Sequence, residues 1–298
     1  MGGIFKKEKF KHIFSSGHST RILKYRIRRD VLIDRALTLT TPGVGDADVI
    51  VSLTSYGRRI LEVGPVIESI FEGSVRPAKV ILWLGDSLKN KPLPIILQRQ
   101  MKRGLEVEFV PDIRSYTKII PALKHYPDST IITIDDDALY PYDLVERLVN
   151  AHSEYPDDII AARIKRIKLG KNGRPERYRR WTMITEPECS DASPLNFLTG
   201  VGGVLYPPHC LDDEVFNKDV FLDICKYADD VWLYAMALKA GTITRKCPTH
   251  TEKGNDFIGD DIDNAPGLRL LNMKKGKEMN DVQFAAVMDY YNLWDKLR

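Results

Sequence analysis

Ile131-Ile132-Thr133-Ile134-Asp135-Asp136-Asp137 is a β-branched apolar stretch that ends in three consecutive carboxylates. The apolar residues favour a buried strand. Carboxylates this close together raise one another's pKa unless positive charge lies among them, and Mg²⁺ or Mn²⁺ with oxygen ligands is a natural counter-charge. The stretch therefore predicts a strand whose end holds a metal ion together with a substrate diphosphate. In the alternative, one acid caps a helix that begins near Pro141 and all three are solvated.

The chain around this stretch alternates between short apolar runs and segments with helical spacing. Strands are predicted over residues 49–53, 80–84 and 107–110, and helices over residues 63–71, 94–102 and 119–125. Continuous apolar strands joined by helices predict an α/β protein with a mostly parallel sheet covered on both faces. Because ligands bind at the carboxyl ends of such strands, one rim is expected to gather Ser52, Thr54, Arg58, Arg59, the loop 112–118 and the acidic triplet.

Composition and motifs exclude several classes of protein. The 298 residues are 43% hydrophobic and 29% charged, as in a globular protein. No run approaches the roughly 18 apolar residues of a membrane span, and no signal peptide is evident, so a cytoplasmic location is expected. The four irregularly spaced cysteines are expected to be reduced. Neither a phosphate-binding P-loop nor a Gly-x-Gly-x-x-Gly motif follows the first strand.

Positive charge is concentrated at the N-terminus. Residues 1–30 carry nine Lys and Arg residues against Glu8 and Asp30, a net charge of +7, whereas the whole chain carries +3. Interleaved with apolar residues, this segment predicts peripheral contact with an anionic membrane surface. In the alternative it is a solvated, partly ordered extension. A second basic region, residues 163–190, is either a loop that holds an anionic acceptor or a solvated hairpin.

The segment 229–241 is predicted to be a helix with acids at its start and Gly241 at its end. Acids in a first turn are stabilised by the helix dipole and by capping, but Asp229 and Asp230 together exceed what one cap requires. A positioned carboxylate is also what an attacking hydroxyl needs as its proton acceptor. Trp232, three residues on, is predicted either to stack on a sugar or to lie buried in the helix's apolar stripe.

A set of short motifs, in order over about residues 48–245, resembles the bacterial GT-A glycosyltransferases of capsule, O-antigen and other surface polysaccharide synthesis. The motifs are Val51-Ser52-Leu53-Thr54-Ser55-Tyr56, residues 116–123, Ile134-Asp135-Asp136-Asp137, Thr199-Gly200-Val201-Gly202-Gly203-Val204 and residues 228–232. The resemblance implies a GT-A (Rossmann-like) fold, a nucleotide-sugar donor, a Mn²⁺ or Mg²⁺ ion held by an Asp-x-Asp motif, and a glycan or lipid-linked acceptor.

The resemblance also implies roles for individual residues. Asp137 is the expected metal ligand, joined by Asp135 and, as in some GT-A enzymes, by His250. Asp135 or Asp136 faces the ribose or a metal-bound water. Asp230 is the expected general base, and Asp229 orients the acceptor. Gly200, Gly202 and Gly203 form the base of the sugar pocket or, in the alternative, a β-bulge or turn. The remaining donor-binding candidates are Ser52, Thr54, Tyr56, Arg58 and Lys118.

The whole sequence thus predicts a basic extension (residues 1–45), a catalytic domain (46–250) and a C-terminal segment (251–298) that packs on it with a helix over 284–297. The predicted activity is metal-dependent transfer from a UDP-sugar, with inversion, in surface polysaccharide synthesis. No nucleic-acid partner is expected. The rivals are a sugar nucleotidyltransferase and a non-enzymatic, basic-tailed binding module in which the Asp clusters only cap helices.

Overall fold

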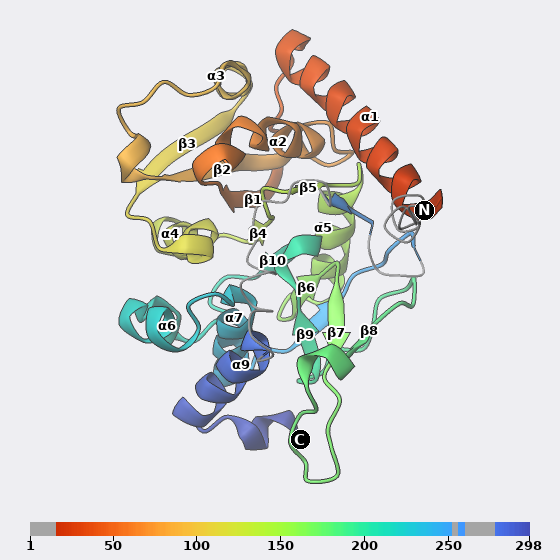
Figure 1. Ribbon diagram of the computed structural model, residues 1–298, viewed down its shortest axis with the longest axis vertical. Helices are drawn as coiled ribbons and strands as arrows, with labels where there is room; N and C mark the ends of the chain where they lie inside the picture. The colour runs from red at the N-terminus through yellow and green to blue at the C-terminus, as the bar shows by residue number, and fades with distance from the viewer. Residues whose placement is uncertain (1–15, 252–255, 260–277) are drawn as a thin grey trace, which may run out of the picture.

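The computed structural model describes residues 16–251, 256–259 and 278–298, and its centre is a seven-stranded sheet (Figure 1). The strand order is β11-β6-β10-β4-β1-β2-β3. β1 pairs in parallel with β2 and β4, while β10 runs antiparallel between β4 and β6. The predicted mostly parallel α/β sheet is therefore confirmed. The bounds are β1 Ala47–Thr54, β2 Pro77–Gly85, β3 Leu105–Val110, β4 Ile131–Thr133, β6 Ile159–Ala161, β10 Val204–Tyr206 and β11 Thr244–Lys246.

Alternation along the strands sends successive side chains to opposite faces of the sheet. Val51 and Leu82 lie in one buried cluster with residues from α1, α2, α3 and α5, whereas Ile50 and Ile81 lie in another with Ala122 of α4. Helices thus cover both faces, as predicted. Their bounds are α1 Ser16–Thr38, α2 Val63–Phe71, α3 Ile95–Met101, α4 Ile120–His125 and α5 Leu144–Glu154. The helices predicted over 63–71, 94–102 and 119–125 are present to within one residue at each end.

Helix α1 makes part of the predicted N-terminal extension an integral element of the fold. Tyr25, Leu32 and Ala36 are buried in the same cluster as the residues of α2. Arg28 and Arg35 both form ion pairs with Glu72, which follows α2. The basic and apolar residues predicted to approach a membrane between residues 1 and 15 lie outside the described ranges.

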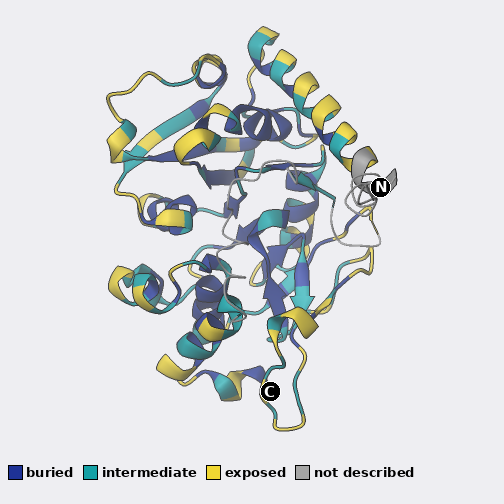
Figure 2. Ribbon diagram, in the orientation of Figure 1, coloured by how far each residue is buried: buried dark blue, intermediate teal, exposed yellow. Residues whose placement is uncertain are grey.

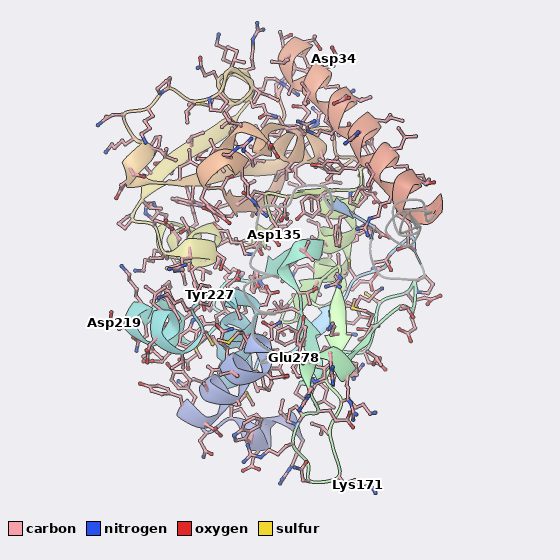
Figure 3. All side chains as sticks on the ribbon, in the orientation of Figure 1. Asp34, Asp135, Lys171, Asp219, Tyr227 and Glu278 are labelled. Carbon is pink, nitrogen blue, oxygen red and sulfur yellow. The ribbon has the colours of Figure 1, made fainter. Side chains whose placement is uncertain are left out.

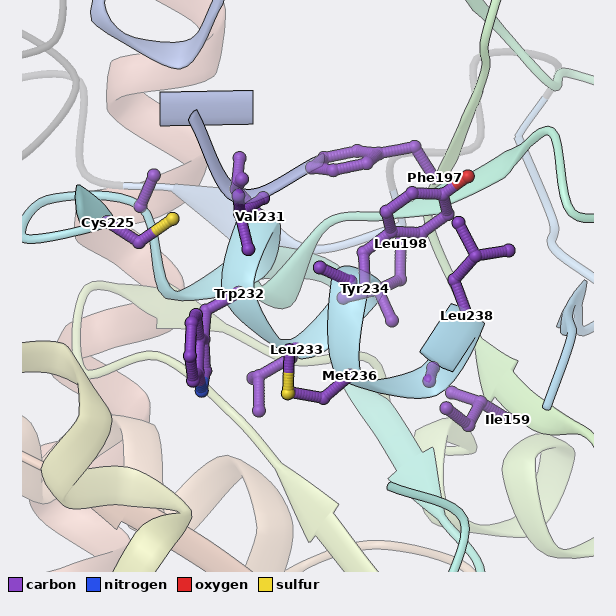
Figure 4. Close-up of a cluster of buried hydrophobic side chains, with 14 of the residues drawn as sticks. Ile159, Phe197, Leu198, Cys225, Val231, Trp232, Leu233, Tyr234, Met236 and Leu238 are labelled. Atoms are coloured by element: carbon purple, nitrogen blue, oxygen red, sulfur yellow. The ribbon is translucent and has the colours of Figure 1, made fainter. Parts of the chain in front are cut away.

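Helix α7 (Asp229–Ala240) is buried on nearly every side (Figure 4). It ends at Gly241 in the left-handed conformation (φ 86°), as its glycine predicted. Trp232 is fully buried, packs edge-on against Phe221 and donates its indole N–H to the carbonyl of Val215. Trp232 therefore occupies the buried position in the apolar stripe of the helix, which was predicted as the alternative to stacking on a sugar.

The basic segment 163–190 folds as a hairpin. β7 (Ile164–Arg166) pairs antiparallel with both β8 (Thr182–Met183) and β9 (Asn196–Leu198), and Lys171 lies at the far tip of the hairpin (Figure 3). Helix α9 (Met279–Tyr290) contacts α7, so the described end of the chain packs against the buried helix. The predicted helix over 284–297 ends early, because Asn292 has a φ of 52° and a 3₁₀ turn, Trp294–Leu297, follows.

No helix within the described ranges is long and apolar enough to cross a membrane. Buried residues, dark blue in Figure 2, dominate the central sheet and α7, whereas exposed residues, yellow, lie on the outer side of α1 and at the hairpin tip. The limits of the three predicted domains stay a prediction.

Candidate functional site

The carboxyl ends of β1 and β4 lie side by side at the point where the strand order reverses. β2 and β3 extend the sheet on one side of β1, and β4 lies on the other. Such a switch point is where open α/β sheets bind ligands. β10 runs in the opposite direction to β4, so the loop before it, Thr199–Gly203, reaches the same edge. This edge, which we call the rim, carries Asp135 near the middle of the molecule (Figure 3).

Lys118 joins the two acidic clusters that the sequence placed far apart. Its Nζ lies 2.6 Å from Oδ1 of Asp135 and 2.9 Å from Oδ2 of Asp229, and its side chain is only 6% exposed. Burial lowers the pKa of this ammonium, but the charges of Asp135, Asp229 and Asp230 outweigh burial and hold the pKa well above its ordinary value. The end of β4 and the start of α7 therefore meet across one buried cation.

Asp230 is held against the Gly200 loop. Its Oδ1 accepts a hydrogen bond of 3.1 Å from the backbone N–H of Gly200. Burial, and then the charge of Asp229, raises the pKa of Asp230 to about 7, against the opposing effect of Lys118. A partly exposed carboxyl that titrates near neutrality can accept a proton from a substrate hydroxyl at working pH.

Gly200 is required for this arrangement. A Cβ at this position would lie 2.8 Å from Oδ1 of Asp230 and 3.0 Å from Nζ of Lys118. The other two glycines of the loop have different reasons: a Cβ at Gly202 would meet the side chain of Arg163 at 2.6 Å, and Gly203 has a φ of 94°. Their expected contact with a sugar stays a prediction, since backbone packing already accounts for both.

Arg59 holds the other two acids of the triplet. Its two terminal nitrogens lie 2.7 Å from Oδ1 of Asp136 and 2.7 Å from Oδ2 of Asp137. The hydroxyl of Ser55 also donates to Asp136, at 2.6 Å. Burial raises the pKa of Asp136 to about 6, although Arg59 opposes the shift. Arg59 was predicted to lie on the rim, but its neighbour Arg58, which is exposed, was expected to join Lys118 as a basic group of the site.

The remaining donor-binding candidates lie in different surroundings. Ser52 is fully buried, where its hydroxyl accepts from the indole N–H of Trp83 and donates to the carbonyl of Lys118. The hydroxyl thereby fixes the loop that carries Lys118, and a contact of Ser52 with the donor stays a prediction. Thr54 donates to the carbonyl of Trp83 at 2.9 Å, and Tyr56 is 57% exposed beside Arg59. Only Tyr56 of these three presents a largely open side chain.

His250 does not join the acidic triplet. Its Nε2 pairs with Oδ2 of Asp143, and its backbone N–H donates to Asp256. His250, the expected third metal ligand, is therefore engaged in contacts that hold the segment after β11 in place. Among the described residues, no group of three or more His, Cys, Asp or Glu side chains is arranged as a ready-made metal site.

The acids of the rim nevertheless fit a hard divalent cation. Five carboxylates, Asp135, Asp136, Asp137, Asp229 and Asp230, face two cations, Lys118 and Arg59. The pKa values of Asp135, Asp136 and Asp230 are raised, by burial first and then in part by neighbouring acids. Asp135 and Asp137 are the part-exposed members of the triplet, with side chains 29% and 39% open. Two open carboxylates suit Mg²⁺ or Mn²⁺ that takes its other ligands from water and phosphate.

The adjacent arginines give a matched test of this geometry. We expect Arg59→Met to weaken nucleotide binding by about tenfold or more, because it removes a charge-assisted contact that orients two acids of the site. Arg58→Met should change binding by no more than about twofold, since an exposed charge is screened by solvent. Isothermal titration of both variants with UDP and Mn²⁺ provides the comparison. Equal effects of the two substitutions would contradict the assignment.

Part of the chain matches a known family. Residues 119–205 match the model described as Glycosyl transferase family 2, a segment that runs from the start of α4 into β10. It contains the acidic triplet and the Gly200 loop, whereas Asp229 and Asp230 lie beyond it. This segment of the chain is therefore similar to that family. A search of curated protein sequences finds no match.

Several solved structures have a similar fold. Residues 1–349 of TarS from S. aureus align with a TM-score of 0.45 and 16% identity over 70% of this chain, which spans 59% of the TarS chain. A mannosyltransferase, PcManGT from Pyrobaculum calidifontis with GDP-Man and Mn²⁺, aligns at 0.41 and 15% over 95% of this chain and 81% of its own. A CMP:2-keto-3-deoxy-manno-octonic acid synthetase complexed with CTP aligns with a TM-score of 0.41 and 12% identity. The alignment covers 67% of this chain and 89% of the synthetase chain.

Proposed function

We propose that the protein is a metal-dependent glycosyltransferase that moves a sugar from a nucleotide-sugar, a UDP-sugar in the first instance, to a glycan or lipid-linked acceptor in surface polysaccharide synthesis. The observation that carries the proposal is the position of Lys118 between Asp135 and Asp229. It brings a carboxylate cluster suited to a metal and a carboxylate pair suited to proton transfer onto one rim. The family match covers the first of these two clusters.

On the donor side, Asp135 and Asp137 are the residues that would hold Mn²⁺ or Mg²⁺. When bound, such an ion offsets the negative charge that grows on a departing diphosphate. Lys118 and Arg59 supply further positive charge in a partly buried setting, where electrostatic stabilisation of a leaving group is strongest. Asp136, held by Ser55 and Arg59, fixes the turn that presents its neighbours.

On the acceptor side, Asp230 takes the proton of the attacking hydroxyl. The hydroxyl oxygen forms the new bond to the anomeric carbon, the sugar–phosphate bond breaks, and its electron pair leaves with the nucleoside diphosphate. One displacement of this kind needs one base and inverts the anomeric centre. The N–H of Gly200 holds the carboxylate in place, while the Lys118–Asp229 ion pair fixes the first turn of α7.

Two rivals make different predictions. A sugar nucleotidyltransferase would consume a nucleoside triphosphate and a sugar phosphate. Its glycine-rich, basic signature is expected directly after the first strand, and Leu53-Thr54-Ser55-Tyr56 does not provide one. In the non-enzymatic alternative the Asp clusters only cap helices. The N-terminus of α7 has no side-chain cap hydrogen bond, and Asp229 instead pairs with Lys118.

The proposal is tested by thermal shift with UDP, GDP, CDP and TDP, each with and without Mn²⁺. We expect one diphosphate to raise the melting temperature by several degrees, since a ligand at about 100 times its Kd adds about 2.7 kcal/mol. The increase should require Mn²⁺ and be lost in Asp137→Asn. A shift with triphosphates and none with diphosphates would favour the nucleotidyltransferase.

A further inference from the structure

Helix α1 carries an apolar stripe on its outer side. Leu23, Ile27 and Val31 are 58%, 57% and 47% exposed, and their spacing of four residues places them along one face of the helix. The opposite face holds Tyr25 and Leu32, which are buried against the rest of the fold. In Figures 1 and 2, α1 runs along the edge of the molecule with its exposed side outward. A helix that buries one apolar face and exposes another has a second surface to cover.

The charges beside this stripe indicate what covers it. Lys24 and Arg26 flank Leu23 and Ile27 on both sides and are exposed. The acids of this outer side, Asp30 and Asp34, lie toward the C-terminal half of the helix. The chain before the helix adds Lys6, Lys7, Lys9 and Lys11. Apolar side chains framed by basic ones complement an anionic lipid surface, in which the apolar groups enter the headgroup boundary and the cations meet phosphates.

We propose that the outer face of the N-terminal half of α1, formed by Leu23, Lys24, Arg26 and Ile27, docks on an anionic membrane surface and lays α1 flat in the interface. This surface is independent of the catalytic proposal, because it involves no residue of the rim.

The test uses the full chain and sedimentation with vesicles of phosphatidylcholine, alone or mixed with phosphatidylglycerol. We expect binding to the mixed vesicles only, weakening as salt is added. Leu23→Ser/Ile27→Ser should reduce the bound fraction by about tenfold, as should Lys24→Glu/Arg26→Glu. The matched control Ile95→Ser/Val282→Ser removes apolar residues of similar exposure elsewhere and should leave binding unchanged. Unchanged melting temperatures establish that each variant is folded.

Three results would overturn the proposal. The first is equal sedimentation of the wild type and the Leu23→Ser/Ile27→Ser variant. The second is equal binding to vesicles with and without phosphatidylglycerol. The third is a wild-type dimer in analytical ultracentrifugation that the same variant dissociates, with no vesicle binding by either protein, which would assign the stripe to a second copy of the chain.

Discussion

Replacing Asp230 with Asn is expected to lower the rate of sugar transfer by about 10²–10⁴, because a positioned general base contributes about that factor. The substitution keeps the size of the side chain and an oxygen that can accept from Gly200 N–H, at 3.1 Å in the wild type. Nucleotide binding should therefore persist. The measurement pairs single-turnover transfer with titration of the nucleotide, which separates the chemical step from binding.

Asp219→Asn is the matched control for this substitution. Asp219 also lies in the first turn of a helix, α6 (Lys218–Ile224), but it is exposed and makes none of the contacts of the rim. Its loss should leave transfer within about twofold, since exposed substitutions away from a site have small effects. Full transfer activity in Asp230→Asn would exclude the base role.

The pH profile gives an independent check on Asp230. Burial raises the pKa of its carboxyl to about 7, and the base acts only when deprotonated. The transfer rate of the wild type should therefore fall as the pH drops below about 7 and level off above it. The residual transfer rate of Asp230→Asn should not show this fall at low pH. A wild-type profile that stays flat from mildly acidic to mildly alkaline pH would contradict the assignment.

Lys118→Met is expected to lower the free energy of unfolding by about 3–5 kcal/mol at neutral pH. Removing one partner of a buried ion pair leaves uncompensated charge, and here Asp135 and Asp229 both lose their cation. The pKa of Asp135 is already raised by burial and should rise further. Protonation relieves the penalty, so the difference from wild type should shrink as the pH is lowered. Denaturant titration at neutral and mildly acidic pH measures it.

Two comparisons make this result specific. Lys89→Met removes an exposed lysine and should change stability by less than about 0.5 kcal/mol. Lys118→Met combined with Asp229→Asn should recover part of the loss, because one of the two unpaired charges is gone. A double variant no more stable than Lys118→Met would show that Lys118 and Asp229 are not coupled.

The sequence predicted most of the framework because its strands are continuous apolar runs and its helical segments have a recognisable apolar spacing. The strand before the acidic triplet and the helix that ends at Gly241 are both where the pattern placed them. The antiparallel direction of β10 was not predicted, since three buried residues after a glycine-rich loop carry no sign of orientation. The helix expected over 284–297 failed because apolar spacing does not show where a chain reverses, as it does at Asn292.

Strand ends alone predicted that Arg59, Lys118 and the acidic triplet share one rim, but they predicted neither the contact of Lys118 with Asp229 nor the other individual contacts. Arg58 and Arg59 follow Gly57, whose φ is 56°, and only the path of that turn decides which guanidinium reaches the acids. Ser52 and Ser55 differ in the same way: the hydroxyl of Ser52 lies in the core beside Trp83, whereas the hydroxyl of Ser55 donates to Asp136. A pattern of residue types indicates which residues lie near one another, whereas the direction in which each side chain points depends on packing.

The two ion pairs of Lys118 have a consequence for the affinity of the site for its ligands. One ammonium divides its charge between Asp135, on the donor side in the proposed mechanism, and Asp229, on the acceptor side. Any ligand that relieves Asp135 of its share leaves more of that charge to Asp229, so occupancy on one side alters affinity on the other. Thermodynamic linkage makes the alteration equal in both directions, so under the proposed function donor and acceptor would each change the affinity for the other by the same factor.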